Sequence, residues 1–194
     1  ASLLVYRNGL LQRSTLDYNL VGSNIVFLAG AIPRAGDILF ASYRLSGSGS
    51  AAPQILCSSI GSPTSSNTPT SIGTCTIPAN LLRPGERVEI SADITHEGTA
   101  KPFTVSANWG GTTMVTRAMP QTETNMAIRI SLGIYTSNTV YGAQNWGASE
   151  AAGSSAGSIA VTYTSPLTLD FLANLDTAGG DSVTLRNYTV IRYP

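Results

Sequence analysis

The feature that most constrains this chain is a two-residue apolar alternation that recurs along its length, while no long segment has a 3.6-residue apolar period. Successive side chains of a strand point to opposite faces of a sheet, so the pattern is typical of strands with one buried face. Alternating rows lie at 86–95, 103–109, 126–134, 159–163, 167–171 and 183–193. The chain is therefore predicted to be all-β.

The last of these rows changes phase at Asn187, which occupies a position that should face inward. A β-bulge there would reset the register onto Tyr188 and Val190. Turn-forming sequences separate the rows, at 83–86, 96–99, 110–111 and 179–181. Strands at this spacing predict an antiparallel β-sandwich of jelly-roll type over residues 54–194.

A small antiparallel β-hairpin module is predicted over residues 1–45. Asn8-Gly9, a strong hairpin signal, separates the apolar segments 4–7 and 10–12. Three further strands are expected at 17–20, 25–28 and 38–43. The core of such a module is too small to make it stable alone, so we expect the module to pack against the second domain or another copy of the chain. The Ser/Gly-rich residues 46–53 are predicted to form a linker.

Composition excludes several classes of partner. Eleven basic residues balance eleven acidic ones, so the basic stripe of a nucleic-acid binder is missing. A hydrophobic fraction of 42% argues against disorder. No apolar run approaches the roughly 20 residues that span a bilayer, and residues 1–5 do not read as a signal peptide. Lysines on exposed edge strands commonly prevent those edges from pairing with other chains, but Lys101 is the single lysine here. We therefore expect the strand edges to be covered in an assembly.

Two cysteines, Cys57 and Cys75, leave two interpretations open. A disulfide between them would close a loop of about 19 residues and stabilise the fold by about 3 kcal/mol. Alternatively, both are small buried apolar residues on neighbouring strands. The intervening Ser/Thr-rich stretch 58–74 is predicted to be an exposed loop.

Candidate catalytic and metal-binding residues are few. The only histidine, His96, lies near Asp93 and Glu97, and these three residues could serve as a general base with a carboxylate or as three metal ligands. No serine lies in a Gly-x-Ser-x-Gly elbow, and the other carboxylates are scattered through turns. We therefore expect His96 to be a structural turn residue, and we expect no enzyme activity, metal or cofactor.

A ligand-binding site is predicted in the segment 134–147, interpreted as a polar loop. Its candidate residues are Tyr135, Tyr141, Gln144, Asn145 and Trp146. An aromatic ring can pack on the apolar face of a sugar while amides bind its hydroxyls. The alternative is that Trp146 fills one end of the core. The Gly/Ala/Ser-rich run 147–158 is interpreted as a mobile loop or a subunit contact.

Two sets of segments resemble bacteriophage proteins. The segments VYRNGLLQ, DYNLVGSNIVF and AGDILFASYRL are similar to a small β module of tail-fibre and related virion proteins. The segments SIGTCTIPANLLRPGERVEI, HEGTAKPFTV, WGGTTMVTR and VTLRNYTVIRYP resemble C-terminal β-sandwich domains of tail-fibre, spike or head-decoration proteins.

The resemblance implies a non-enzymatic virion structural protein, commonly homotrimeric, at or near the site that meets the host surface. Other virion proteins and a cell-surface glycan are the further partners we expect. It carries over no catalytic residues. One alternative is an extracellular or cell-surface carbohydrate-binding adhesin module. Another is an extracellular filament subunit, in which the N-terminal strand of one copy completes the sheet of the next.

Overall fold

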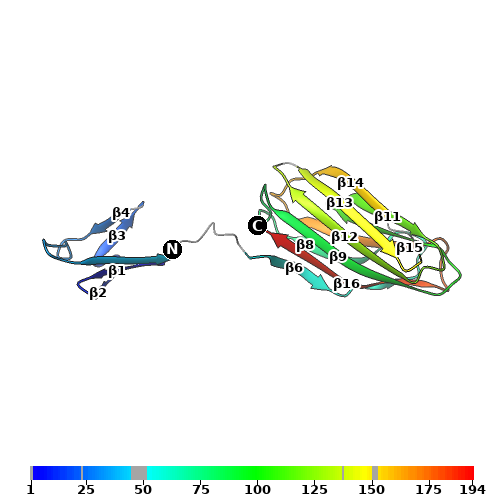
Figure 1. Ribbon diagram of the computed structural model, residues 1–194, viewed down its shortest axis with the longest axis horizontal. Helices are drawn as coiled ribbons and strands as arrows, with labels where there is room; N and C mark the ends of the chain where they lie inside the picture. The colour runs from blue at the N-terminus through cyan, green and yellow to red at the C-terminus, as the bar shows by residue number, and fades with distance from the viewer. Residues whose placement is uncertain (1, 23, 45–51, 137, 150–152) are drawn as a thin grey trace. The chain divides into compact units, whose positions relative to one another are not determined.

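The computed structural model describes residues 2–22, 24–44, 52–136, 138–149 and 153–194, and within these ranges every regular element is a β-strand. The chain divides into two compact units, Ala1–Ser50 (unit 1) and Ala51–Pro194 (unit 2) (Figure 1). Most of the predicted linker 46–53 lies outside the described residues. No described segment forms a helix long and apolar enough to cross a membrane.

Unit 1 contains a three-stranded antiparallel sheet and a separate hairpin. The sheet has the order β2-β1-β5, and the hairpin pairs β3 with β4. The strands are β1 (Ser2–Arg7), β2 (Leu10–Gln12), β3 (Tyr18–Val21), β4 (Asn24–Phe27) and β5 (Leu39–Arg44). Asn8 and Gly9 have φ values of 52° and 80°, as a type I′ turn requires, which confirms the predicted hairpin.

The same asparagine also ties the first hairpin to the segment that enters β5. Its side-chain amide donates to Asp37 Oδ1 at 2.6 Å, and its amide oxygen accepts the N–H of Ile38 at 2.9 Å. Arg7 reaches the other oxygen of Asp37, at 2.8 Å. Polar contacts therefore order one end of a unit in which the buried apolar residues, among those whose side chains the structure describes, are Val5, Tyr18 and Ala31.

Unit 2 is an antiparallel β-sandwich of jelly-roll type, as predicted. One sheet has the order β11-β10-β15-β8, and the other has the order β14-β13-β12-β9-β16-β6, with β7 also pairing with β16 (Figure 1). The strands are β6 (Gln54–Ser59), β7 (Pro63–Thr64), β8 (Thr70–Ile77), β9 (Arg87–Glu97), β10 (Phe103–Trp109), β11 (Thr112–Met119), β12 (Asn125–Ile134), β13 (Asn138–Gly147), β14 (Gly153–Ala160), β15 (Leu167–Leu175) and β16 (Ser182–Tyr193).

The core of unit 2 lies between the two sheets, and the alternating residues supply it. Along β9 every even-numbered residue from Val88 to His96 is buried, while the odd-numbered residues face outward. Trp109 and Phe171 are the largest fully buried side chains. The predicted bulge is confirmed, because the register between β16 and β9 shifts between Leu185 and Asn187 and returns Tyr188 to the core.

The two open sides of the sandwich are closed differently. On one side Cys57 of β6 and Cys75 of β8 form a disulfide with Cα atoms 5.9 Å apart, so the sheets are covalently joined. On the other side the hydroxyl of Ser155 in β14 donates to the carbonyl of Met114 in β11, at 3.2 Å. Of the two interpretations of the cysteines, the structure contains the bonded one.

Three loop and strand predictions were wrong. The stretch 58–74 is mostly exposed, as predicted, but it is not a loop, since it includes the end of β6, all of β7 and the start of β8. The run 147–158 is not a mobile loop, since its described part belongs largely to β14, which has a full ladder with β13; the alternative of a subunit contact stays a prediction. The strand predicted at 159–163 ends at Ala160. Ala160 pairs with Asn138, the first residue of β13, so β13 offers no partner to the residues that follow.

Candidate functional site

The five residues of the predicted aromatic loop do not form one site. Four of them lie on β13, which pairs with β12 as far as Gly147 and with β14 as far as Asn145 and is therefore a strand. Alternation turns Tyr141 and Asn145 toward the core, where Asn145 is only 3% exposed. Gln144 and Trp146 face outward, and Tyr135 lies beyond the end of β12. The pleat thus divides the set between two faces of the sheet.

Cross-strand pairing shows which residues surround Gln144 and Trp146 on the outer face. Directly opposed residues of an antiparallel sheet share a face. One row across β9, β12 and β13 joins Asp93, Ala127 and Trp146. The next rows add residues of the same strands and of β14: Ser91, Arg129, Gln144 and Ser154, then Glu89, Ser131, Gly142 and Ala156. We call these eleven residues the outer-face patch.

Arg129 organises the centre of this patch. Its Nη1 donates to the carbonyl oxygens of Ile128 at 2.8 Å and Ala92 at 3.1 Å, and its Nη2 lies 3.2 Å from Asp93 Oδ1. The guanidinium carbon also lies 5.5 Å from the centre of the Trp146 ring, within cation–π range. The ion pair is half exposed and contributes little stability, so its main effect is to orient these side chains.

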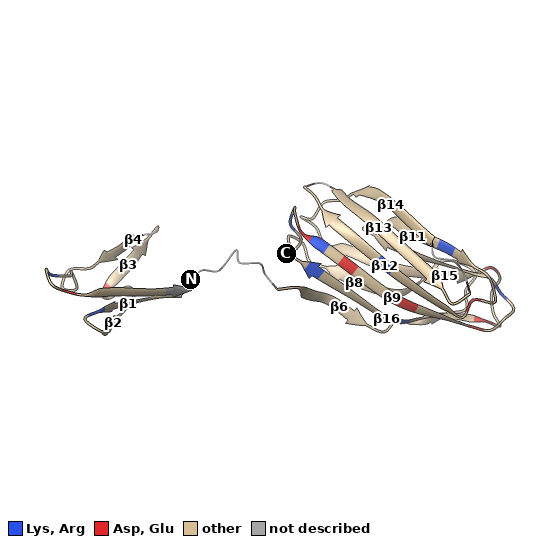
Figure 2. Cartoon of the chain, viewed as in Figure 1, with Lys and Arg blue, Asp and Glu red and all other residues tan. Residues whose placement is uncertain are grey.

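Trp146 is 38% exposed, so the alternative interpretation, that it fills one end of the core, was wrong. A shallow hollow of about 630 Å³ lies over the strands beside Arg129, and a second of about 330 Å³ includes Trp146. Several small residues line the larger hollow, and a Cβ added at one of them, Gly142, would meet nothing within 4 Å. Charges are sparse on the strands of this unit (Figure 2).

His96 lies in strand β9 rather than in a turn, and its side chain is fully buried. Its Nδ1 is 3.1 Å from the carbonyl oxygen of Glu123, its Nε2 is 3.3 Å from Asp181 Oδ2, and its ring stacks on Phe103 at 4.6 Å. Asp93 is on the opposite face of β9, so it cannot share an ion with His96. Within the described part of the chain, no three His, Cys, Asp or Glu side chains group as a metal site.

Glu123 forms a second buried polar centre, which sequence reasoning missed. Its carboxylate accepts the N–H groups of Ala148 at 2.7 Å, Ser149 at 2.9 Å, Thr124 at 3.1 Å and Asn125 at 3.2 Å, and also the Ser149 hydroxyl. Burial by itself raises the pKa of this carboxyl, but these hydrogen bonds outweigh it and lower the pKa to about 2. A single Glu in a turn carries no sequence signal for this role.

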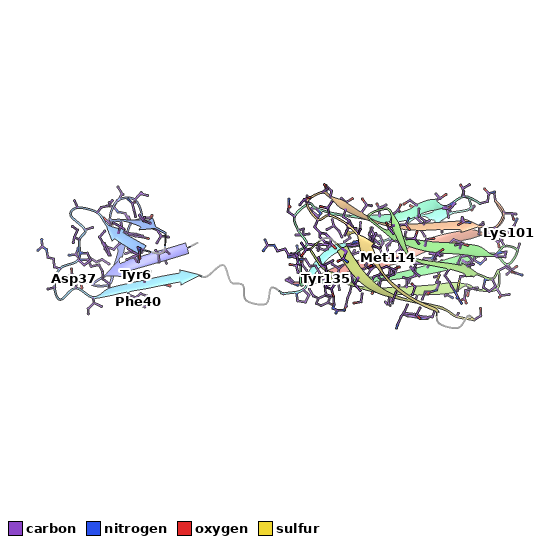
Figure 3. The ribbon with its side chains drawn as sticks, turned by 90° about the horizontal axis from the view of Figure 1, so that it is seen from above. Tyr6, Asp37, Phe40, Lys101, Met114 and Tyr135 are labelled. Atoms are coloured by element: carbon purple, nitrogen blue, oxygen red, sulfur yellow. A yellow bond between two sulfur atoms is a disulfide. The ribbon has the colours of Figure 1, made fainter. Side chains whose placement is uncertain are left out.

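Unit 1 presents a different kind of surface. Among the described residues, eleven large apolar side chains are exposed in it and two, Val5 and Tyr18, are buried, while the much larger unit 2 exposes five. The Tyr6 and Phe40 rings lie side by side on its sheet with centroids 6.0 Å apart (Figure 3). The exposed apolar residues of unit 1 are Leu4, Leu10, Leu11, Leu16, Leu20, Val21, Val26, Ile32, Ile38, Leu39 and Phe40.

Neither protein-family models nor curated protein sequences match the chain. Among solved structures, the insecticidal delta-endotoxin Cry8Ea1 from Bacillus thuringiensis is 14% identical over 68% of this chain, with a TM-score of 0.35. The EclA C-terminal domain, a sugar-binding protein, is 13% identical to this chain, with a TM-score of 0.38. The match covers 77% of this chain and 82% of the EclA domain.

The VP2 subviral particle of infectious bursal disease virus is 13% identical over 74% of this chain, with a TM-score of 0.34. The chain spans 20% of the toxin chain and 33% of the VP2 chain. With TM-scores this low, the three likenesses carry no argument about function.

Proposed function

We propose that this chain is a non-enzymatic structural protein of a virion, a tail-fibre or decoration component that self-associates through unit 1. The observation that carries the proposal is the apolar surface of unit 1, where eleven large apolar side chains of the described residues are exposed and two are buried. The resemblance of the sequence segments to phage virion modules supports the same role.

A unit of this size is marginal without help from a partner, because small domains bury too little of their surface. Each buried apolar side chain would contribute about 1.5–3 kcal/mol, so covering even a few of the eleven would stabilise unit 1 substantially. Identical copies carry identical patches and can cover one another in a closed symmetric oligomer. A homotrimer is the form we expect, with other virion proteins as further partners.

The surroundings of His96 support the non-enzymatic part of the proposal. Its side chain has no solvent exposure and is enclosed by Phe103, Asp181 and a backbone carbonyl. A general base has to come within hydrogen-bond reach of its substrate. The enclosed ring therefore acts as a packing and hydrogen-bonding residue, and the proposed role needs no cofactor.

The filament alternative is less well supported. It requires the N-terminal strand to be available to a neighbour's sheet. In the structure β1 is the central strand of its own sheet, with β2 on one side and β5 on the other. Donating β1 would therefore break both of these ladders.

The test is the solution mass of the full chain and of two matched variants. Sedimentation equilibrium at micromolar concentration should give an oligomer, with three chains as the expected number. Phe40→Asp should dissociate it, whereas Ile60→Asp in unit 2, which replaces a similarly exposed residue, should not. A monomeric wild-type chain, or an oligomer that survives Phe40→Asp, would contradict the proposal. Phe40 is exposed, so its replacement leaves the small core intact.

A further inference from the structure

Trp146 has the placement of a stacking platform. It faces outward on β13, its cross-strand neighbour is the small Ala127 of β12, and the Arg129 guanidinium carbon lies 5.5 Å from the centre of its ring. A partly exposed tryptophan fixed on a rigid element offers a large apolar face at little entropic cost. The apolar C–H face of a pyranose is a flat ligand surface that such a ring can cover.

The residues around the tryptophan are suited to hydroxyl groups. Ser91, Ser131 and Gln144 surround Arg129 on the same face, and each side chain can both donate and accept hydrogen bonds. A sugar hydroxyl also does both, so it can match these groups in several orientations. An apolar ligand would leave the same groups without partners when it covered them.

The charge on this face favours a neutral ligand. The Arg129 guanidinium already donates to the Asp93 carboxylate and to two backbone carbonyls. Glu89 adds a second carboxylate to the lining of the larger hollow. The Arg87 guanidinium donates to the Ser131 hydroxyl at 2.5 Å, so two carboxylates and two cations balance on this face. A sulfated or uronic-acid polymer would therefore meet no net positive charge there.

The space is also appropriate for a chain of sugars. The larger hollow, about 630 Å³, crosses four strands beside Arg129, and the smaller one reaches Trp146. Volumes of this order are usual for small-ligand sites. Gly142 keeps the floor open, since no atom lies within 4 Å of where its Cβ would be.

From these observations we infer that the outer-face patch binds a neutral oligosaccharide. Trp146 stacks on one sugar ring, and Gln144, Ser91 and Ser131 hydrogen-bond the hydroxyls of the neighbouring units. Arg129 is a positioning residue that holds the tryptophan ring. The inference concerns unit 2 alone and does not depend on the oligomeric state proposed for unit 1.

The experiment screens the full chain on an array that carries neutral hexose and N-acetylhexosamine oligomers beside sulfated and uronic-acid polymers, followed by titration of the best neutral oligomer. Trp146→Ala should weaken binding about tenfold, the usual worth of an aromatic stacking contact. Gly142→Leu should fill the hollow and weaken binding at least as much. Tyr135→Ala, which removes an exposed aromatic outside the patch, should leave the affinity unchanged.

Thermal unfolding of each variant establishes that the sandwich is intact, as expected at exposed positions. Binding to neutral oligomers that is insensitive to ionic strength and weakened about tenfold or more in both patch variants supports the inference. Binding confined to the anionic polymers, neutral binding that survives both Trp146→Ala and Gly142→Leu, or an array to which the wild-type chain does not bind would overturn it.

Discussion

Replacing Glu123 by glutamine tests how much the buried carboxylate contributes to stability. Hydrogen bonds lower the pKa of Glu123 from 4.5 to about 2, despite the burial that by itself raises it. Each pKa unit corresponds to about 1.4 kcal/mol, so the ionised carboxylate stabilises the folded chain by about 3 kcal/mol. Glutamine keeps the shape but loses the charge, and its amide N–H groups would face the backbone N–H donors of Ala148 and Ser149.

The sign of the pH dependence follows from the lowered pKa. The folded state binds the proton less tightly than the unfolded state, so the contribution is complete above pH 4.5 and is lost as the pH falls toward 2. The Glu123→Gln variant should therefore be about 3 kcal/mol less stable than the wild type at pH 7, with the difference shrinking as the pH approaches 2.

The assay is urea unfolding followed by tryptophan fluorescence, which reports on unit 2 because both tryptophans, Trp109 and Trp146, lie in it. Glu97→Gln is the matched control, since Glu97 is exposed and its ion pair with Arg186 is a surface one, worth less than about 1 kcal/mol. A loss below about 1 kcal/mol for Glu123→Gln at pH 7, or an equal loss at pH 7 and pH 2, would refute the reasoning.

Three further predictions concern the sandwich. Replacing Cys57 and Cys75 together by serine should lower the free energy of unfolding by about 3 kcal/mol, because the bond closes a loop between residues 18 apart; equal stability with and without a reductant would contradict this. Trp109→Ala should cost about 3–5 kcal/mol, whereas Trp146→Ala should cost much less, because only Trp109 is fully buried; chemical denaturation compares the two. Gly98→Ala should lower the melting temperature, because φ is 110° at this position and the new Cβ would lie 2.2 Å from the buried Asp181 carboxylate. An unchanged melting temperature would count against that geometry.

Local patterns determine much of the fold and could therefore be predicted. The strands β9, β10 and β12 alternate strictly, so their buried faces follow from the period alone. The Asn8-Gly9 hairpin and the bulge at Asn187 are equally local, since each depends on a few neighbouring residues. In each case the local preference and the tertiary structure agree.

β13 and β14 could not be predicted in the same way. β13 carries Gly, Asn and Gln among its alternating residues, and β14 reads Gly-Ser-Ser-Ala-Gly-Ser, a composition typical of loops. They are strands because β12 provides a complete ladder for β13, and β13 provides one for β14. That stabilisation comes from pairing with other strands, which local propensity does not report.

The outer-face patch was found only in part for the same reason. Gln144 and Trp146 are close in sequence, and their residue types already indicated sugar recognition. Arg129 and Asp93 come from other strands, and only the register of β12 with β9 and β13 places them beside Trp146. Glu123 was missed because its partners are mostly backbone N–H groups, which every residue type can supply.

The central claim is that this chain functions as an assembly held together by unit 1. Single-particle electron microscopy of the full chain tests it most directly. We predict particles with three sandwich domains joined through their N-terminal units. Isolated single chains, or particles in which the contacts between copies are made by the sandwiches alone, would contradict the claim.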